Sequence, residues 1–158
     1  MKKMPMMMLL AAPYIFIAVC AAKGLGGSAF ITWAVLCVLV YLPNMVYAFL
    51  LPRFGYEGRQ LLFWNLLLKI VNIPVYVLVI LIVLMLHIFI LPLAPFLVLF
   101  DYSLLLSSSM YGVSGIMECC AKGKLSKKEM LVNIIMQLLF CLDVASALYC
   151  YFKVRKDS

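Results

Sequence analysis

Long hydrophobic runs separated by short charged clusters set the pattern of this chain. The runs span residues 6–22, 29–51, 61–91, 96–119 and 130–152. A helix rises about 1.5 Å per residue and the hydrocarbon of a bilayer is about 30 Å thick, so about 20 apolar residues suffice for one crossing. The pattern therefore predicts an all-α, polytopic helical membrane protein, with five transmembrane helices in one bundle and one domain over residues 1–158.

Prolines and charged residues set the boundaries of these helices. From 61 to 120 the chain is almost continuously apolar, which is too long for one crossing, and Pro92 and Pro95 mark a turn between two helices. Pro43 predicts a kink in the second helix. The first run follows two lysines and so has the features of a cleavable signal peptide. We favour an uncleaved helix, with cleavage as the alternative.

Composition supports a membrane environment. The chain is 68% hydrophobic and 12% charged, whereas soluble domains are about half apolar and about a quarter charged. So few polar residues cannot cover a water-exposed surface, and the polar stretches are too short for a separate extramembrane domain. We therefore expect the lipid bilayer to be the main partner of the chain.

The net charge of +7 serves as a topology signal. Its Lys and Arg residues are scattered over short loops with no basic helix, so nucleic acid is not expected as a partner. One side of the five-helix layout carries Lys2, Lys3, Arg53, Arg59, Lys122, Lys124, Lys127 and Lys128. The other side carries Lys23, Lys153, Arg155 and Lys156. The larger first set predicts a cytoplasmic N-terminus in a plasma membrane or a bacterial inner membrane.

The C-terminal basic cluster does not fit this layout. Five crossings from an inside N-terminus place Lys153, Arg155 and Lys156 outside, against the positive-inside rule. Either the rule is violated there, or one segment, such as the first or the run after Pro92, does not cross fully.

The loop between the fourth and fifth predicted helices has two expected roles. Its basic residues, from Lys122 to Lys128, are expected to contact anionic lipid headgroups. Ser126, with Glu129 three residues later, predicts a capping box at the start of the fifth helix.

Polar residues inside the predicted helices fall on defined faces. At about 100° per residue, one face of the helix over 96–119 carries Ser103, Ser107, Tyr111, Ser114 and Glu118. A second face carries Asp101, Ser108, Gly112 and Gly115. We interpret Ser108, Gly112 and Gly115 as a helix-packing face, because small residues let helix backbones approach closely. One face of the preceding helix carries Lys69, Asn72, Tyr76 and His87. That face should meet the helix over 96–119, which we expect to be central.

Ionisable residues are costly in hydrocarbon and usually face protein or water. Counting from the helix ends places His87, Asp101 and Asp143 at similar depth near the outer surface. We expect an acidic site there that binds a cation or a proton, with a purely structural role of the acids as the alternative. Deeper in the bundle, Lys69 is expected to pair with Glu118 or with a carbonyl group. The Ser, Asn and Gln residues are interpreted mainly as interhelical hydrogen-bond partners.

Two classes of function remain open. The first is a small transporter or channel-like subunit that uses the acidic site. The alternative is a non-catalytic accessory subunit that packs through Ser108, Gly112 and Gly115 against a larger membrane complex, or against a second copy. No nucleophile with an adjacent base indicates an enzyme, so no catalytic residue is assigned. The cysteines have no C-x-x-C spacing and no neighbouring His, so neither a metal site nor a cofactor is expected.

Overall fold

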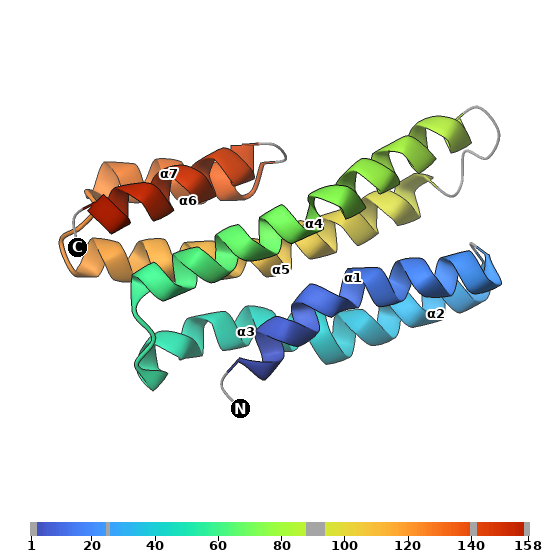
Figure 1. Ribbon diagram of the computed structural model, residues 1–158, viewed down its shortest axis with the longest axis horizontal. Coiled ribbons are helices and arrows are strands. Elements are labelled where there is room, and N and C mark those ends of the chain that lie inside the picture. Colours follow the sequence, from blue (N-terminus) through green and yellow to red (C-terminus); the bar gives the residue numbers. More distant parts are fainter. Residues whose placement is uncertain (1–2, 25, 88–93, 140–141, 157–158) are drawn as a thin grey trace.

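The computed structural model describes residues 3–24, 26–87, 94–139 and 142–156, which form helices joined by short turns, with no strand among them (Figure 1). The helices are α1 (Met4–Lys23), α2 (Gly27–Leu36), the π-helix η1 (Cys37–Tyr41), α3 (Leu42–Leu50), the 3₁₀-helix η2 (Leu51–Phe54), α4 (Gly58–His87), α5 (Ala94–Ala121), α6 (Lys127–Gln137) and α7 (Leu142–Lys156). The all-helical class expected from the sequence is confirmed.

Four helical segments have the length and hydropathy needed to cross a membrane. They are Met4–Lys23, Gly27–Phe54, Gly58–Ile82 and Pro95–Ala121. They match the first four predicted helices, while the turn expected at Pro92 lies outside the described residues. In the most apolar window of α5, 61% of the residues are buried, against 44% in α4 and 28% in each of the first two segments. The central position expected for the helix over 96–119 therefore holds.

The second of these segments contains a π turn in place of a simple proline kink. Leu42 donates its backbone N–H to the carbonyl of Cys37, five residues earlier, and Pro43 follows within the first turn of α3. Proline has no N–H to donate to the residue four positions before it, so the regular ladder cannot continue through this point. The wider π turn absorbs the interruption and keeps the segment from Gly27 to Phe54 continuous.

The single fifth helix predicted over 130–152 is wrong. The chain forms two shorter helices, α6 and α7, which lie side by side and run in opposite directions (Figure 1). The Ser146 hydroxyl donates to the Asn133 side chain at 2.9 Å, and the Tyr149 hydroxyl donates to the Glu129 carboxylate at 3.3 Å. In one straight helix residues 13 positions apart would be about 20 Å apart along the axis. These contacts therefore require the chain to fold back.

This C-terminal hairpin covers only part of the bundle. With 11 residues in α6 and 15 in α7, the two helices are about 16 and 22 Å long. The 30 residues of α4 extend over about 45 Å. Figure 1 shows the hairpin along one half of α4 and α5, with the end of α6 and the start of α7 near their middle.

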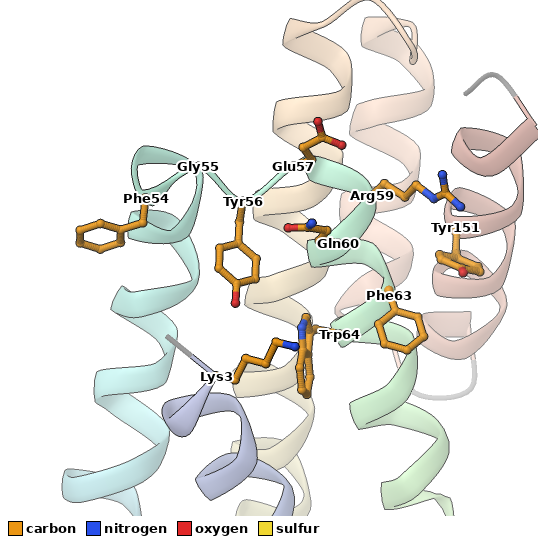
Figure 2. Close-up of a pocket in the computed structure, with 10 residues that line it drawn as sticks. All are labelled: Lys3, Phe54, Gly55, Tyr56, Glu57, Arg59, Gln60, Phe63, Trp64 and Tyr151. Atoms are coloured by element: carbon orange, nitrogen blue, oxygen red, sulfur yellow. The ribbon is translucent and has the colours of Figure 1, made fainter. Parts of the chain in front are cut away.

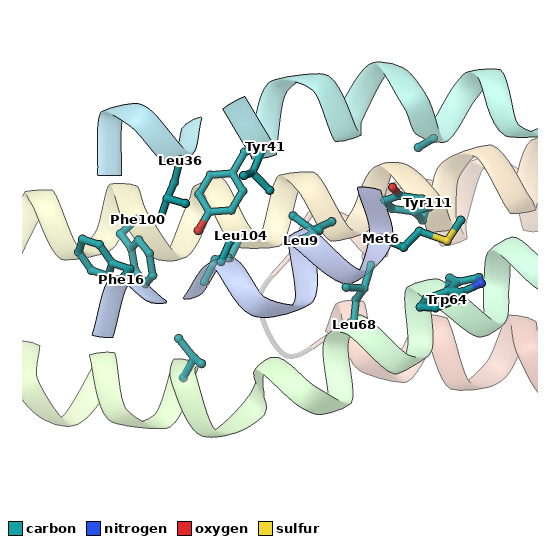
Figure 3. Close-up of a cluster of buried hydrophobic side chains, with 14 of the residues drawn as sticks. Met6, Leu9, Phe16, Leu36, Tyr41, Trp64, Leu68, Phe100, Leu104 and Tyr111 are labelled. Carbon is teal, nitrogen blue, oxygen red and sulfur yellow. The ribbon is translucent and has the colours of Figure 1, made fainter. Parts of the chain in front are cut away.

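A shared hydrophobic core holds the four long apolar segments together (Figure 3). Leu9 and Phe16 of α1 insert among side chains from the other three apolar segments, and the Phe16 ring stacks on the Phe100 ring of α5 with centroids 4.0 Å apart. Leu68 of α4 and Tyr41 of η1 belong to the same cluster. Each of these side chains is almost fully buried, so α1 is an integral part of the bundle.

The hairpin accounts for the position of the basic C-terminal residues, which did not fit a layout with five crossings. It returns the C-terminus to the end of the bundle where α5 meets α6 (Figure 1). We call this end, which holds residues 52–59, residues 121–128 and the last turn of α7, the basic end. The basic residues there are Lys3, Arg53, Arg59, Lys122, Lys124, Lys127, Lys128, Lys153, Arg155 and Lys156. The last predicted run thus forms no helix of crossing length, whereas the first run and the run after Pro92 each form a helix that is long and apolar enough to cross.

Candidate functional site

A buried ion pair joins the middle of α4 to the turn of the hairpin. The Lys69 ammonium lies 2.8 Å from Asp143 Oδ2, and the two side chains are 0% and 3% exposed. The expected pairing of Lys69 with Glu118 or a carbonyl is therefore wrong. The reason is the fold-back, which brings Asp143 from the expected outer layer to the depth of Lys69.

Ser109 of α5 completes this junction. The Lys69 ammonium also donates to Ser109 Oγ at 3.2 Å, and the Ser109 hydroxyl donates to the Gln137 carbonyl at 2.6 Å. The other Asp143 oxygen accepts the N–H of Val144 at 2.8 Å. Helix ends leave backbone groups without intrahelical partners. Here the end of α6 and the start of α7 find those partners in side chains rather than in water.

A chain of amides and hydroxyls continues from this junction toward the basic end. Asn65 Nδ2 donates to Gln137 Oε1 at 3.3 Å, and Ser146 Oγ lies 3.5 Å from Gln137 Nε2. Asn133 accepts from Ser146 in turn. All four side chains are nearly fully buried. These four residues form hydrogen bonds between helices as expected, whereas Ser103, Ser107 and Ser108 donate to carbonyls of their own helix.

Glycines bring the helices close enough for this chain of bonds. A Cβ at Gly112 would lie 2.6 Å from Asn65 Nδ2 and 2.8 Å from Gln137 Oε1. A Cβ at Gly115 would lie 3.1 Å from the Gly58 carbonyl oxygen. Ser108, on the same helix, is buried and donates to the Leu105 carbonyl of its own helix. The face of Ser108, Gly112 and Gly115 is therefore filled within the chain, which removes the docking face that the accessory-subunit hypothesis needed.

A groove lies above the turn of the hairpin, between α4, α5 and the start of α7. Its volume is about 430 Å³. Its lining consists of Ile73, Tyr76, Val77, Val79, Ile80, Leu84, Val98, Asp101, Asp143 and Val144. Two acids thus line an otherwise apolar groove. Asp101 is 5% exposed, and its Oδ1 atom has no hydrogen-bond partner among the described residues.

The structure brings together some of the predicted site residues and separates others. Asp101 and Asp143 share the groove, and Lys69 pairs with Asp143 at its floor. Glu118 lies 17 positions beyond Asp101 on α5, about 25 Å away along the axis, and pairs with Lys122 at 2.8 Å. It does not belong to this site. His87 is the last residue of α4, and its side chain lies outside the described part of the chain.

The face of α5 that carries Tyr111 is packed against η1 and α3. The Tyr111 hydroxyl donates to Asn44 Oδ1 at 2.6 Å, and Asn44 Nδ2 donates to the Val40 carbonyl at 2.8 Å. Both residues are nearly fully buried. At Tyr111 this polar face therefore contacts a neighbouring helix.

Sequence reasoning missed two residues of the junction, Asn65 and Ser109. Asn65 stands four positions before Lys69, on the same face of α4, and this spacing was an available signal. Ser109 ends the run Ser107-Ser108-Ser109, and nothing in the sequence distinguishes it from its two neighbours.

Charged residues also close the base of the hairpin. Ser126 and Glu129 form the predicted capping box at the start of α6, which is confirmed. Lys153 of α7 bonds to the Glu129 carboxylate. This bond, together with the N–H and hydroxyl of Ser126, lowers the pKa of Glu129 from 4.5 to about 2. The same carboxylate raises the pKa of Lys153.

These features define a class: a small all-helical protein with four helices apolar and long enough to cross a membrane, and a short C-terminal hairpin held by a buried ion pair. The chain belongs to a family of unknown function (DUF6652), whose model matches residues 4–156. No curated protein and no solved structure matches the chain.

Proposed function

We propose that this protein is an integral membrane protein that binds and carries a proton or an organic cation at Asp101. Four helices cross the bilayer, and the hairpin enters it from the basic end and returns to that end. The basic end faces the cytoplasm, because Lys and Arg are retained on that side of a membrane. Both termini are then cytoplasmic, and Lys23 marks the opposite surface.

The observation that carries the binding proposal is the state of the two acids in the groove. Asp143 is neutralised by Lys69, whereas Asp101 has a buried carboxylate oxygen without a partner among the described residues. A buried charge without a counter-ion is costly, so Asp101 either takes up a proton or attracts a cation. We therefore assign binding of the proton or organic cation to Asp101. The ion pair of Lys69 and Asp143 holds the start of α7 against α4 at the groove.

The chemistry of the lining favours a proton or an organic cation over a metal ion. Ca²⁺ and Mg²⁺ take six or more oxygen ligands, or several waters with carboxylates. The lining offers the Asp101 and Asp143 carboxylates and the Tyr76 hydroxyl amid aliphatic side chains. An ammonium group attached to a hydrocarbon body matches this surface, since the head reaches Asp101 and the body contacts Ile80 and Val98.

The hairpin supplies the element by which a carrier would alternate its access. It lies between Asp101 and the basic end, because Asp143 and Val144 at the start of α7 line the groove. Displacement of the hairpin would open a path from Asp101 to the cytoplasm. The glycine-lined contact between α4 and α5 would remain closed during that motion.

Reconstituted liposomes with an internal pH dye test this function. A pH gradient or a hydrophobic amine should produce proton movement with the wild-type protein, and Asp101→Asn should reduce its rate at least tenfold. Glu118→Gln is the matched control, because it removes a carboxylate from the same helix outside the groove, and its rate should stay within twofold. Wild-type protein without transport, or Asp101→Asn with an unchanged rate, would refute the proposal.

A further inference from the structure

A second hollow lies at the basic end, apart from the groove that contains Asp101. Its volume is about 600 Å³. It is lined by Lys3, Phe54, Gly55, Tyr56, Glu57, Arg59, Gln60, Phe63, Trp64 and Tyr151 (Figure 2). These residues come from the start of α1, the link between η2 and α4, the first turns of α4, and α7. Four elements thus meet around one space.

Two cations face this hollow from different elements. Lys3 precedes α1 and Arg59 stands in the first turn of α4, and neither forms an ion pair with a described acid. The one acid in the lining, Glu57, directs its carboxylate away from Lys3 and Trp64 (Figure 2). The hollow therefore offers uncompensated positive charge to a ligand.

Aromatic side chains form the remaining walls. Figure 2 shows Trp64 beside the Lys3 side chain, and Tyr151 on the Arg59 side of the hollow. Tyr and Trp favour the headgroup region of a bilayer because their rings are apolar and their tips are polar. Phe63 lines the same hollow and is 44% exposed. The hollow thus passes from charged groups to an apolar surface on the outside of α4.

We propose that this hollow binds an anionic phospholipid, with the headgroup in the space that Lys3 and Arg59 line and the acyl chains over Phe63. A free phosphate ion would satisfy the charges but would leave most of about 600 Å³ and the aromatic walls without a partner. A phospholipid satisfies both parts, because its phosphate and its hydrocarbon are joined at the depth where these residues lie. This site differs from the loop between Lys122 and Lys128, whose residues do not line the hollow.

The chain has two tryptophans, which makes a direct measurement possible. Trp64 lines the hollow, whereas Trp33 packs against Phe30 and Phe96 near the other end of the bundle. Trp33→Phe therefore leaves Trp64 as the only tryptophan. In detergent, this variant is titrated with short-chain phosphatidylglycerol, short-chain phosphatidylcholine and inorganic phosphate, and Trp64 fluorescence is followed. Phosphatidylglycerol with brominated chains tests whether the chains lie near the ring.

Phosphatidylglycerol should give a saturable change and bind at least tenfold more tightly than phosphatidylcholine or phosphate, and brominated chains should quench Trp64. Lys3→Ala with Arg59→Ala should weaken binding at least tenfold. Lys124→Ala with Lys127→Ala removes the same charge from the nearby loop and should change the affinity less than twofold. Equal affinity for phosphatidylcholine, saturation by phosphate at the same concentration, or equal losses in the two double variants would overturn the proposal.

Two further variants keep the result interpretable. Arg59→Gln alone removes the charge and keeps a polar side chain, so a loss of binding in a variant with an unchanged circular dichroism spectrum reports on the guanidinium rather than on folding. Unchanged binding contradicts the site. Asp101→Asn should bind phosphatidylglycerol as tightly as the parent, since Asp101 does not line this hollow. The test of the lipid site is therefore independent of the test of transport.

Discussion

Lys69 and Asp143 are 74 positions apart in the chain, yet the ammonium of one lies 2.8 Å from a carboxylate oxygen of the other. The contact requires the last part of the chain to enter the bundle and turn back at the depth of Lys69. Ser109 and Gln137 bond to the same junction. The position of the hairpin is therefore specified by polar contacts at its turn, where an error of one helical turn would leave two buried charges unpaired.

Breaking this pair should be more damaging than removing it. Lys69→Met or Asp143→Leu alone leaves one buried charge without a partner, which typically costs about 3–5 kcal/mol. The double variant leaves no charge and should recover most of that loss. Unfolding free energies in mixed micelles, arranged as a double-mutant cycle, measure the coupling. Additive losses in the two single variants would show that the pair does not hold the hairpin.

Gly112 should tolerate a methyl group poorly. The new Cβ of Gly112→Ala would lie 2.6 Å from Asn65 Nδ2, inside a closely packed contact, and overpacking of this kind costs about 1–3 kcal/mol. Gly27→Ala is the matched control, because no atom lies within 4 Å of its Cβ position. Its effect should remain within about 0.5 kcal/mol. Thermal unfolding of the two variants separates close packing from a general effect of alanine, and equal melting temperatures would contradict the packing argument.

Acid should weaken the contact between Glu129 of α6 and Lys153 of α7 over a pH range set by Glu129. Because folding lowers the pKa of this group from 4.5 to about 2, its contribution is complete above pH 4.5 and is lost as the pH falls toward 2. The melting temperature of wild type should exceed that of Glu129→Gln at pH 7, and the gap should narrow through this window. A gap of the same size at pH 7 and pH 2.5 would show that the carboxylate charge is not involved.

The proposed topology places the C-terminus on the same side as the loop between α5 and α6. A reporter that is active only in the cytoplasm should therefore be active when fused after residue 156 or after residue 124. Fusion after residue 24 should give the opposite result, since Lys23 marks the other surface. Opposite signals from the reporters fused after residues 124 and 156 would show that the chain crosses the membrane a fifth time and would contradict the hairpin.

The spanning helices could be predicted from sequence because their ends are marked locally. Charged clusters and prolines mark the ends of α1, α4 and α5. The hydrophobic stretch between those ends is by itself long enough to predict a helix that could cross a membrane. The capping box of Ser126 and Glu129 is equally local, since both partners are three residues apart. The π turn before Pro43 was anticipated only as a kink, because proline removes a donor without specifying how the backbone responds.

The hairpin and the partner of Lys69 could not be predicted in the same way. The residues 138–142 contain no Gly or Pro, and the run over 130–152 has the length of a crossing. Asn133 and Ser146 fall on different faces of a straight helix, and they meet only when the helix is folded back. Lys69 was expected to pair with Glu118 or a carbonyl because a straight last helix places Asp143 near the outer surface, and only the fold-back brings Asp143 beside Lys69.

In the proposed topology, a chain end that enters and leaves on one side has a consequence for biosynthesis. No part of the hairpin has to be translocated, so Asp143 and the basic C-terminal turn stay on the side where they are made. The four spans can insert first, and the hairpin then docks between them as a late step of maturation. A nascent chain that ends before residue 127 lacks Asp143 and Gln137, so Lys69 and Asn65 stay without these partners until the hairpin has been made.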